Sequence, residues 1–127
     1  MQFFILIYKI PIMIKVYGIK NCDTMKKTFS WLDAHNVEYQ FIDYKIKGVV
    51  AEQIDVWLSR VAWETLINTR GMMWRKIPDD KKANLNKEIA YRLIIEYPSS
   101  IKRPIITYKN QVLVGFHPDL FEKELLV

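Results

Sequence analysis

One cysteine, Cys22, is the residue of this 127-residue chain best suited to covalent chemistry. It lies in the run Gly-Ile-Lys-Asn-Cys-Asp-Thr, between an apolar segment and a segment with helical periodicity. A cysteine at a helix start faces free backbone N–H groups and the positive end of the helix dipole, and both favour the nucleophilic thiolate. Asp23 opposes this effect, because a neighbouring carboxylate disfavours a second negative charge. Position alone leaves two interpretations open, a reactive thiolate or a small buried hydrophobic residue.

A second thiol is absent, because Met25 stands where a Cys-x-x-Cys motif has its second cysteine. Any disulfide that Cys22 forms is therefore intermolecular, and a redox role needs an external reductant such as glutathione. A lone cysteine also fits a reducing compartment, so we expect a cytoplasmic protein. Thr24 has two candidate roles: it caps the helix, which is the commoner one, or it donates its hydroxyl to the sulfur.

Two arginines in predicted loops are candidate partners of the sulfur. Arg70 lies in Asn-Thr-Arg-Gly, and Arg103 lies in Ile-Lys-Arg-Pro. If their guanidinium groups converge on Cys22, they lower its pKa and hold an oxyanion or a carboxylate through paired hydrogen bonds. The alternative is two solvated arginines. Pro104 begins the next predicted strand, and a trans peptide bond is its default, because only about one X–Pro bond in twenty is cis.

The elements that position these residues follow from hydrophobic periodicity. In chain order, the pattern predicts a strand at 13–17, a helix at 23–36, a strand at 38–44, helices at 51–61, 63–68 and 79–97, strands at 104–108 and 111–114, and a helix at 118–126. Asp23 is the expected N-cap of the first helix, and Asn36 its expected end. The order predicts an α/β fold of thioredoxin-like topology, a mixed four-stranded sheet built as β-α-β, helical insertion, β-β-α. Residues 13–127 would form one domain, with the insertion at about 49–98.

Composition narrows the classes of function. Hydrophobic residues make up 50% and charged residues 26%, which is typical of a globular domain and argues against disorder, collagen and coiled coil. The net charge of +5 mildly favours anionic partners. Basic pairs are scattered and no nucleic-acid motif accompanies them, so we expect no nucleic-acid partner. One cysteine and two distant histidines, His35 and His117, predict no metal site.

Residues 1–12 form an N-terminal extension before the first predicted strand. Its apolar run from Phe3 to Tyr8 is six residues long. A membrane-spanning helix needs about 20, so we expect no membrane partner. Two interpretations stay open, an extra strand or a start codon placed too early with Met13 as the true start. We expect a monomer, although an ordered extension would offer an exposed edge for a dimer contact.

Four short motifs follow one another in a specific order along the chain. They are Gly18–Thr24, Asn68–Gly71 followed by Trp74–Lys76, Lys102–Pro104, and Gly115–Phe116. Together they resemble the ArsC/Spx family, and within it the YffB-like branch, from about Met13 to the C-terminus. The resemblance implies a thioredoxin fold with a helical insertion, one reactive cysteine at Cys22, and an anion site that uses Arg70 and Arg103. In such a fold a proline at the position of Pro104 is commonly cis and lies against the active sulfur.

The resemblance implies a glutathione-dependent one-thiol reductase that is related to arsenate reductases. Cys22 would form a mixed disulfide with glutathione or with a small anionic or disulfide substrate. No cofactor would be bound, and glutathione would be a co-substrate. The chain departs from glutaredoxin-coupled arsenate reductases, which usually carry His-Asn-Pro before the cysteine region and an arginine late in the chain. Here Gly-Ile-Lys-Asn replaces His-Asn-Pro, and His117 is the nearest substitute for the late arginine. Both departures argue against arsenate as the substrate.

The same family offers an alternative function, an Spx-like regulator of transcription that acts by binding another protein. In that case a basic face docks an acidic partner, and Cys22 is a sensor or a relic. The regulator often carries Cys-x-x-Cys, which is absent here, and this weakens a redox-switch role.

Overall fold

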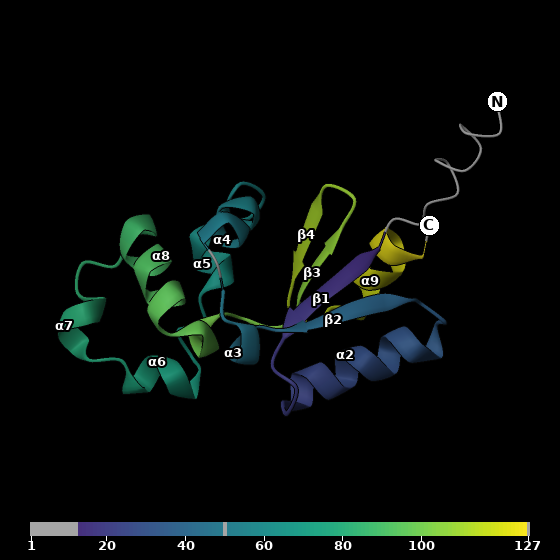
Figure 1. Ribbon diagram of the computed structural model, residues 1–127, viewed down its shortest axis with the longest axis horizontal. Coiled ribbons are helices and arrows are strands. Elements are labelled where there is room, and N and C mark those ends of the chain that lie inside the picture. Colours follow the sequence, from purple (N-terminus) through teal and green to yellow (C-terminus); the bar gives the residue numbers. More distant parts are fainter. Residues whose placement is uncertain (1–12, 50, 127) are drawn as a thin grey trace.

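The structure, a computed structural model, describes residues 13–49 and 51–126. Within them, β1 (Ile14–Gly18), α2 (Asp23–Ala34) and β2 (Tyr39–Asp43) form a β-α-β unit whose two strands run parallel. The hairpin of β3 (Ile105–Tyr108) and β4 (Gln111–Val114) joins the sheet through antiparallel pairing of β3 with β1. The strand order is β2-β1-β3-β4 (Figure 1). This confirms the predicted mixed four-stranded, thioredoxin-like α/β fold.

Apolar side chains alternate between the two faces of the central strand β1, as the pleat of a strand requires. Val16 packs with Leu32 of α2 and Phe121 of α9 (Pro118–Leu125) in one buried cluster. Tyr17, the next residue, packs on the opposite face with Trp57 in a second cluster that extends through the insertion. Figure 1 shows the insertion helices gathered at the left of the view, away from α2 and α9. The sheet is thus covered by two separate sets of helices.

The insertion is built from short helices. They are α3 (Tyr44–Lys47), α4 (Ala51–Leu58), α5 (Trp63–Leu66), α6 (Met72–Lys76), α7 (Asp79–Lys82), α8 (Lys87–Glu96) and the 3-10 turn η1 (Pro98–Ser100). The prediction of one helix over 79–97 is wrong, because Asn84 has a positive φ of 55° and interrupts it. Asn86 then starts α8 as its N-cap, and its side chain accepts a 2.9 Å hydrogen bond from the N–H of Ile89. Asparagine suits both positions, since it tolerates left-handed backbone and caps helices.

A short backbone pairing ties the insertion to the sheet just before β3. Ile67, which follows α5, forms an isolated antiparallel bridge with Ile101. The N–H of Asn68 donates to the carbonyl of Ser100 at 2.7 Å, and that of Lys102 donates to the carbonyl of Leu66 at 2.8 Å. The loop after α5 therefore lies beside the segment that leads into Arg103 and Pro104.

The two interpretations of residues 1–12 lie outside the described residues. Among the helices that the structure describes, none has the length and apolar character needed to cross a membrane.

Candidate functional site

Cys22 lies between β1 and α2, in the N-cap position of the helix. Its backbone is extended, with φ −146° and ψ 134°, and its carbonyl accepts a 3.0 Å hydrogen bond from the N–H of Lys26. The prediction of Asp23 as the N-cap is wrong, because Asp23 is already the first helical residue. Asn36 ends the helix segment as predicted, with a positive φ of 56° just beyond the last turn.

Gly18 allows the first turn of α2 to approach the end of β1 closely. A Cβ on this residue would lie 2.5 Å from both Sδ and Cε of Met25, far inside van der Waals contact. Both residues are buried. The missing side chain at Gly18 thus lets Met25 fill the space below the strand, and this packing fixes the helix start that carries Cys22.

The environment of the Cys22 sulfur favours the thiolate. Partial burial raises the pKa of this thiol, but the Arg103 side chain and the backbone N–H groups of Met25 and Thr24 outweigh burial and bring the pKa below its usual range. The side chain makes no cap hydrogen bond of regular geometry. A sulfur atom is large and accepts long, weakly directional contacts, so its negative charge is still stabilised by these N–H groups. The Arg103 side chain and the start of α2 therefore favour the thiolate form of Cys22 from two sides.

Backbone carbonyls hold the Arg103 side chain in place. Its Nη1 donates to the carbonyls of Ser99 and Ile101, both at 3.1 Å. Burial lowers the pKa of Arg103, but the Cys22 sulfur and the hydroxyl of Tyr44, the first residue of α3, outweigh burial and raise it. The Tyr44 hydroxyl itself donates to the Ile101 carbonyl at 3.3 Å. Burial raises the pKa of Tyr44 to about 12, so the hydroxyl stays neutral beside the guanidinium.

The Arg103–Pro104 peptide bond is cis. The default expectation of a trans bond is wrong at this residue, and the cis bond expected from thioredoxin-like folds is present. A general preference of X–Pro bonds carries no information about the surrounding fold, which decides the isomer here. The Pro104 carbonyl accepts a 2.8 Å hydrogen bond from the N–H of Gly115, which follows β4 with a φ of 88°.

The sulfur borders a cavity of about 230 Å³. Its lining residues are Cys22, Thr24, Asn68, Lys102, Arg103 and Gly115. Among the described residues, two cations and no carboxylate line this cavity, so it suits an anionic ligand that approaches the sulfur.

The structure brings only some of the predicted site residues to this cavity. Thr24 and Arg103 line it with Cys22, whereas Pro104 is buried and is not among the lining residues. Arg70 is exposed on the loop after α5 and is not among the lining residues. Its backbone N–H donates to Oδ1 of Asn68 at 3.2 Å.

Sequence reasoning missed Asn68, Lys102 and Gly115 as individual site residues, although all three fall inside the quoted motifs. A usable signal was available for Lys102, because it directly precedes Arg103 in a predicted loop.

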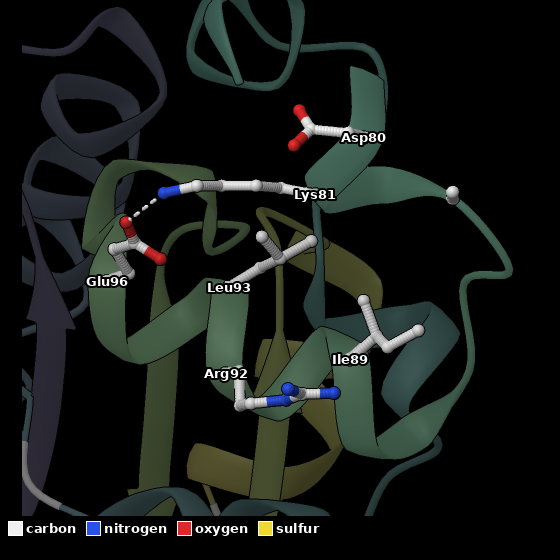
Figure 2. A pocket seen from close by; sticks show the side chains of 7 residues that line it. Asp80, Lys81, Ile89, Arg92, Leu93 and Glu96 are labelled. Atoms are coloured by element: carbon white, nitrogen blue, oxygen red, sulfur yellow. Dashed lines mark hydrogen bonds and ion pairs between the residues drawn. The ribbon is translucent and has the colours of Figure 1, made fainter. Parts of the chain in front are cut away.

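A larger cavity, of about 320 Å³, lies between α7 and α8 in the insertion. Figure 2 shows Lys81 extending across it to Glu96, with which it forms an ion pair. In the part of the chain that the structure describes, its lining contains no cysteine, histidine, serine or threonine, and the Lys81–Glu96 pair neutralises part of its charge. We therefore place the chemistry at the smaller cavity, where the nucleophile lies.

The chain combines a thioredoxin-like sheet with one cysteine at a helix start and an arginine before a cis-proline. Residues 17–123 match the ArsC family, and the chain belongs to that family.

Known relatives cover most of the chain. A protein of Haemophilus influenzae described only as uncharacterized is 40% identical over 105 residues, which are 83% of this chain and 92% of that protein. The global transcriptional regulator Spx 1 of Lactococcus lactis is 27% identical over 109 residues, 84% of each chain.

Solved structures agree with this assignment. A YffB protein is 42% identical and superposes with a TM-score of 0.86, over 89% of this chain and 99% of that one. An arsenate reductase related protein from Brucella melitensis is 41% identical with a TM-score of 0.71, over 91% of this chain and 96% of that one. The predicted resemblance to the ArsC/Spx family and its YffB-like branch is confirmed.

Proposed function

We propose that this protein is a glutathione-dependent one-thiol reductase and that the Cys22 thiolate is its nucleophile. The observation that carries the proposal is the pairing of the sulfur with Arg103 and the first N–H groups of α2, which lowers the pKa of the thiol. A thiolate that is populated at neutral pH attacks disulfides far faster than a thiol does. A merely structural cysteine needs no such pairing.

The proposed reaction has two exchange steps. The Cys22 thiolate attacks the glutathione sulfur of a mixed disulfide, a Cys22–glutathione disulfide forms, and the reduced substrate leaves as a thiolate. The thiolate of a second glutathione then attacks the glutathione sulfur of that adduct. Oxidised glutathione leaves and the Cys22 thiolate returns. Glutathione supplies both electrons, so no bound cofactor and no second cysteine are needed.

The remaining predicted residues have proposed roles in the same reaction. The N–H of Thr24 stabilises the sulfur as attacking and as leaving group. The carbonyl of buried Pro104 fixes Gly115 at the cavity edge. Arg70, on the exposed loop beside Asn68, reaches the anionic part of a bound ligand from the solvent side. Because the reaction needs reduced glutathione, we place it in the cytoplasm.

A turnover assay tests this function. Reduction of a small glutathione mixed disulfide is followed with excess glutathione, for the wild type, C22S and an exposed control, S30A, on the outer face of α2. We expect turnover that C22S abolishes and S30A preserves, and none with arsenate. Absence of turnover with every mixed disulfide tried, while Cys22 still alkylates rapidly, would overturn the proposal.

The competing proposal is a regulator that works by binding a protein, and the similarity to Spx 1 over 84% of both chains is what favours it. Under this proposal C22S still captures the partner in a pull-down. Under the reductase proposal, the same variant abolishes turnover.

A further inference from the structure

The guanidinium of Arg103 has few hydrogen-bond donors left for a ligand. Two bonds from Nη1 go to the carbonyls of Ser99 and Ile101. Further contacts go to the Cys22 sulfur and the Tyr44 hydroxyl. The Nε donor is buried and has no partner among the described residues. A guanidinium has five N–H donors, so this count leaves little for a bound carboxylate.

Lys102 is the other cation that lines the cavity, and within the described residues it forms no ion pair. Its backbone is clamped by the hydrogen bond to Leu66, so the base of the side chain is fixed at the cavity edge. Asn68 lines the same edge and uses Oδ1 for the N–H of Arg70, which leaves its amide NH₂ group to donate. The Lys102 ammonium and the Asn68 amide thus lie at the cavity on two segments that backbone hydrogen bonds hold side by side.

We infer that Lys102, assisted by the amide of Asn68, binds the carboxylate of the incoming thiol or disulfide, while Arg103 serves the sulfur. The inference rests on the proposed function and gives the two cations that line the cavity different roles. It assigns substrate preference to carboxylate-bearing disulfides over neutral ones. A lysine ammonium is a point charge on a flexible stem, so it tolerates different carboxylate positions and suits substrates that vary in shape.

Rates of disulfide exchange at Cys22 test this assignment, with K102M compared against K20M. Lys20 is an exposed lysine two residues before Cys22 and outside the cavity lining, so K20M makes the same charge change near the sulfur. Three probes are used: glutathione disulfide and dithiobis(nitrobenzoate), which carry carboxylates, and dithiodipyridine, which is neutral. Alkylation by iodoacetamide against pH reports the pKa of Cys22 in each variant.

We expect K102M to slow both carboxylate probes by about tenfold, the size of a charge-assisted hydrogen bond, and to leave dithiodipyridine within about twofold. K20M should leave all three rates within about twofold. Equal slowing of all three probes by K102M, or no slowing of any, would overturn the assignment.

The two proposals fail separately. If glutathione disulfide alone fails to react with the wild type, the glutathione-dependent function is wrong. The ratio of dithiobis(nitrobenzoate) to dithiodipyridine rates in K102M then still decides the role of Lys102.

Discussion

Replacing Arg103 by methionine should raise the pKa of Cys22 and slow its chemistry at neutral pH. The guanidinium stabilises the thiolate through a hydrogen bond and through its charge. Methionine is apolar, so the variant removes both contributions and leaves the N–H groups of Thr24 and Met25 in place. The pKa therefore rises without losing the whole stabilisation, because the helix start still acts on the sulfur.

The expected magnitude follows from the contacts. A hydrogen bond to a charged group contributes about 1.5–3 kcal/mol. Cys22 is half-buried, so solvent screens part of this energy and the lower end applies. Since about 1.4 kcal/mol corresponds to a factor of ten, the thiolate fraction at neutral pH should fall about tenfold. Arg103→Lys keeps the charge but loses the guanidinium fork that donates to Ser99 and Ile101. Its thiolate fraction at neutral pH should lie between those of the wild type and of Arg103→Met.

The assay is the rate of alkylation by neutral iodoacetamide as a function of pH, with the midpoint as the readout. The plateau rate is not used, because a thiolate of higher pKa is intrinsically more nucleophilic. R75M is the matched control, since Arg75 is exposed in the last turn of α6. Urea unfolding shows whether each variant is folded. A midpoint in folded R103M equal to that of the wild type would refute the electrostatic account of the site.

Four further results are expected. The folded-state pKa of Cys22 lies below the unfolded-state value near 9.0, so the thiolate stabilises the fold above that value and the effect is lost as pH falls through the folded-state pKa. The free energy of unfolding of the wild type should therefore rise relative to that of C22S as the pH rises toward 9.0. A difference between the two that stays constant with pH in urea unfolding would contradict the pKa shift. Y44F should lose about 1 kcal/mol in the same assay, because the carbonyl of Ile101 loses a donor, and an unchanged unfolding midpoint would contradict this. G18A should cost about 1–3 kcal/mol through its clash with Met25, and a cost as large in a background without the Met25 side chain would rule the clash out. N86A should cost about 1 kcal/mol by uncapping α8, and an unchanged unfolding midpoint would show that the cap is dispensable.

Local sequence patterns were sufficient to predict the sheet. The strands read as short apolar runs, and a β-α-β unit has one favoured hand, so the parallel pairing of β1 and β2 follows. The place of Cys22 at the start of α2 was predictable for the same reason. The interruption before α8 was missed because Leu85, Ile89 and Leu93 continue one helical stripe across it.

The contacts that complete the site depend on residues far apart in the sequence. The pairing of Ile67 with Ile101 decides that Asn68 and Lys102 face the cavity and that Arg70 stays outside it. Nothing in a single sequence reports that register. From the sequence the two arginines are hard to tell apart, since each lies in a predicted loop that resembles a family motif, and only tertiary contacts distinguish them.

The most direct test of the proposed function is the intact mass of the protein after exposure to oxidised glutathione. We predict a gain of one glutathionyl group on Cys22 in the wild type, its removal by reduced glutathione, and no gain in C22S. An unmodified wild-type chain, under conditions that modify free cysteine, would contradict the assignment of Cys22 as the nucleophile of a glutathione-dependent reductase.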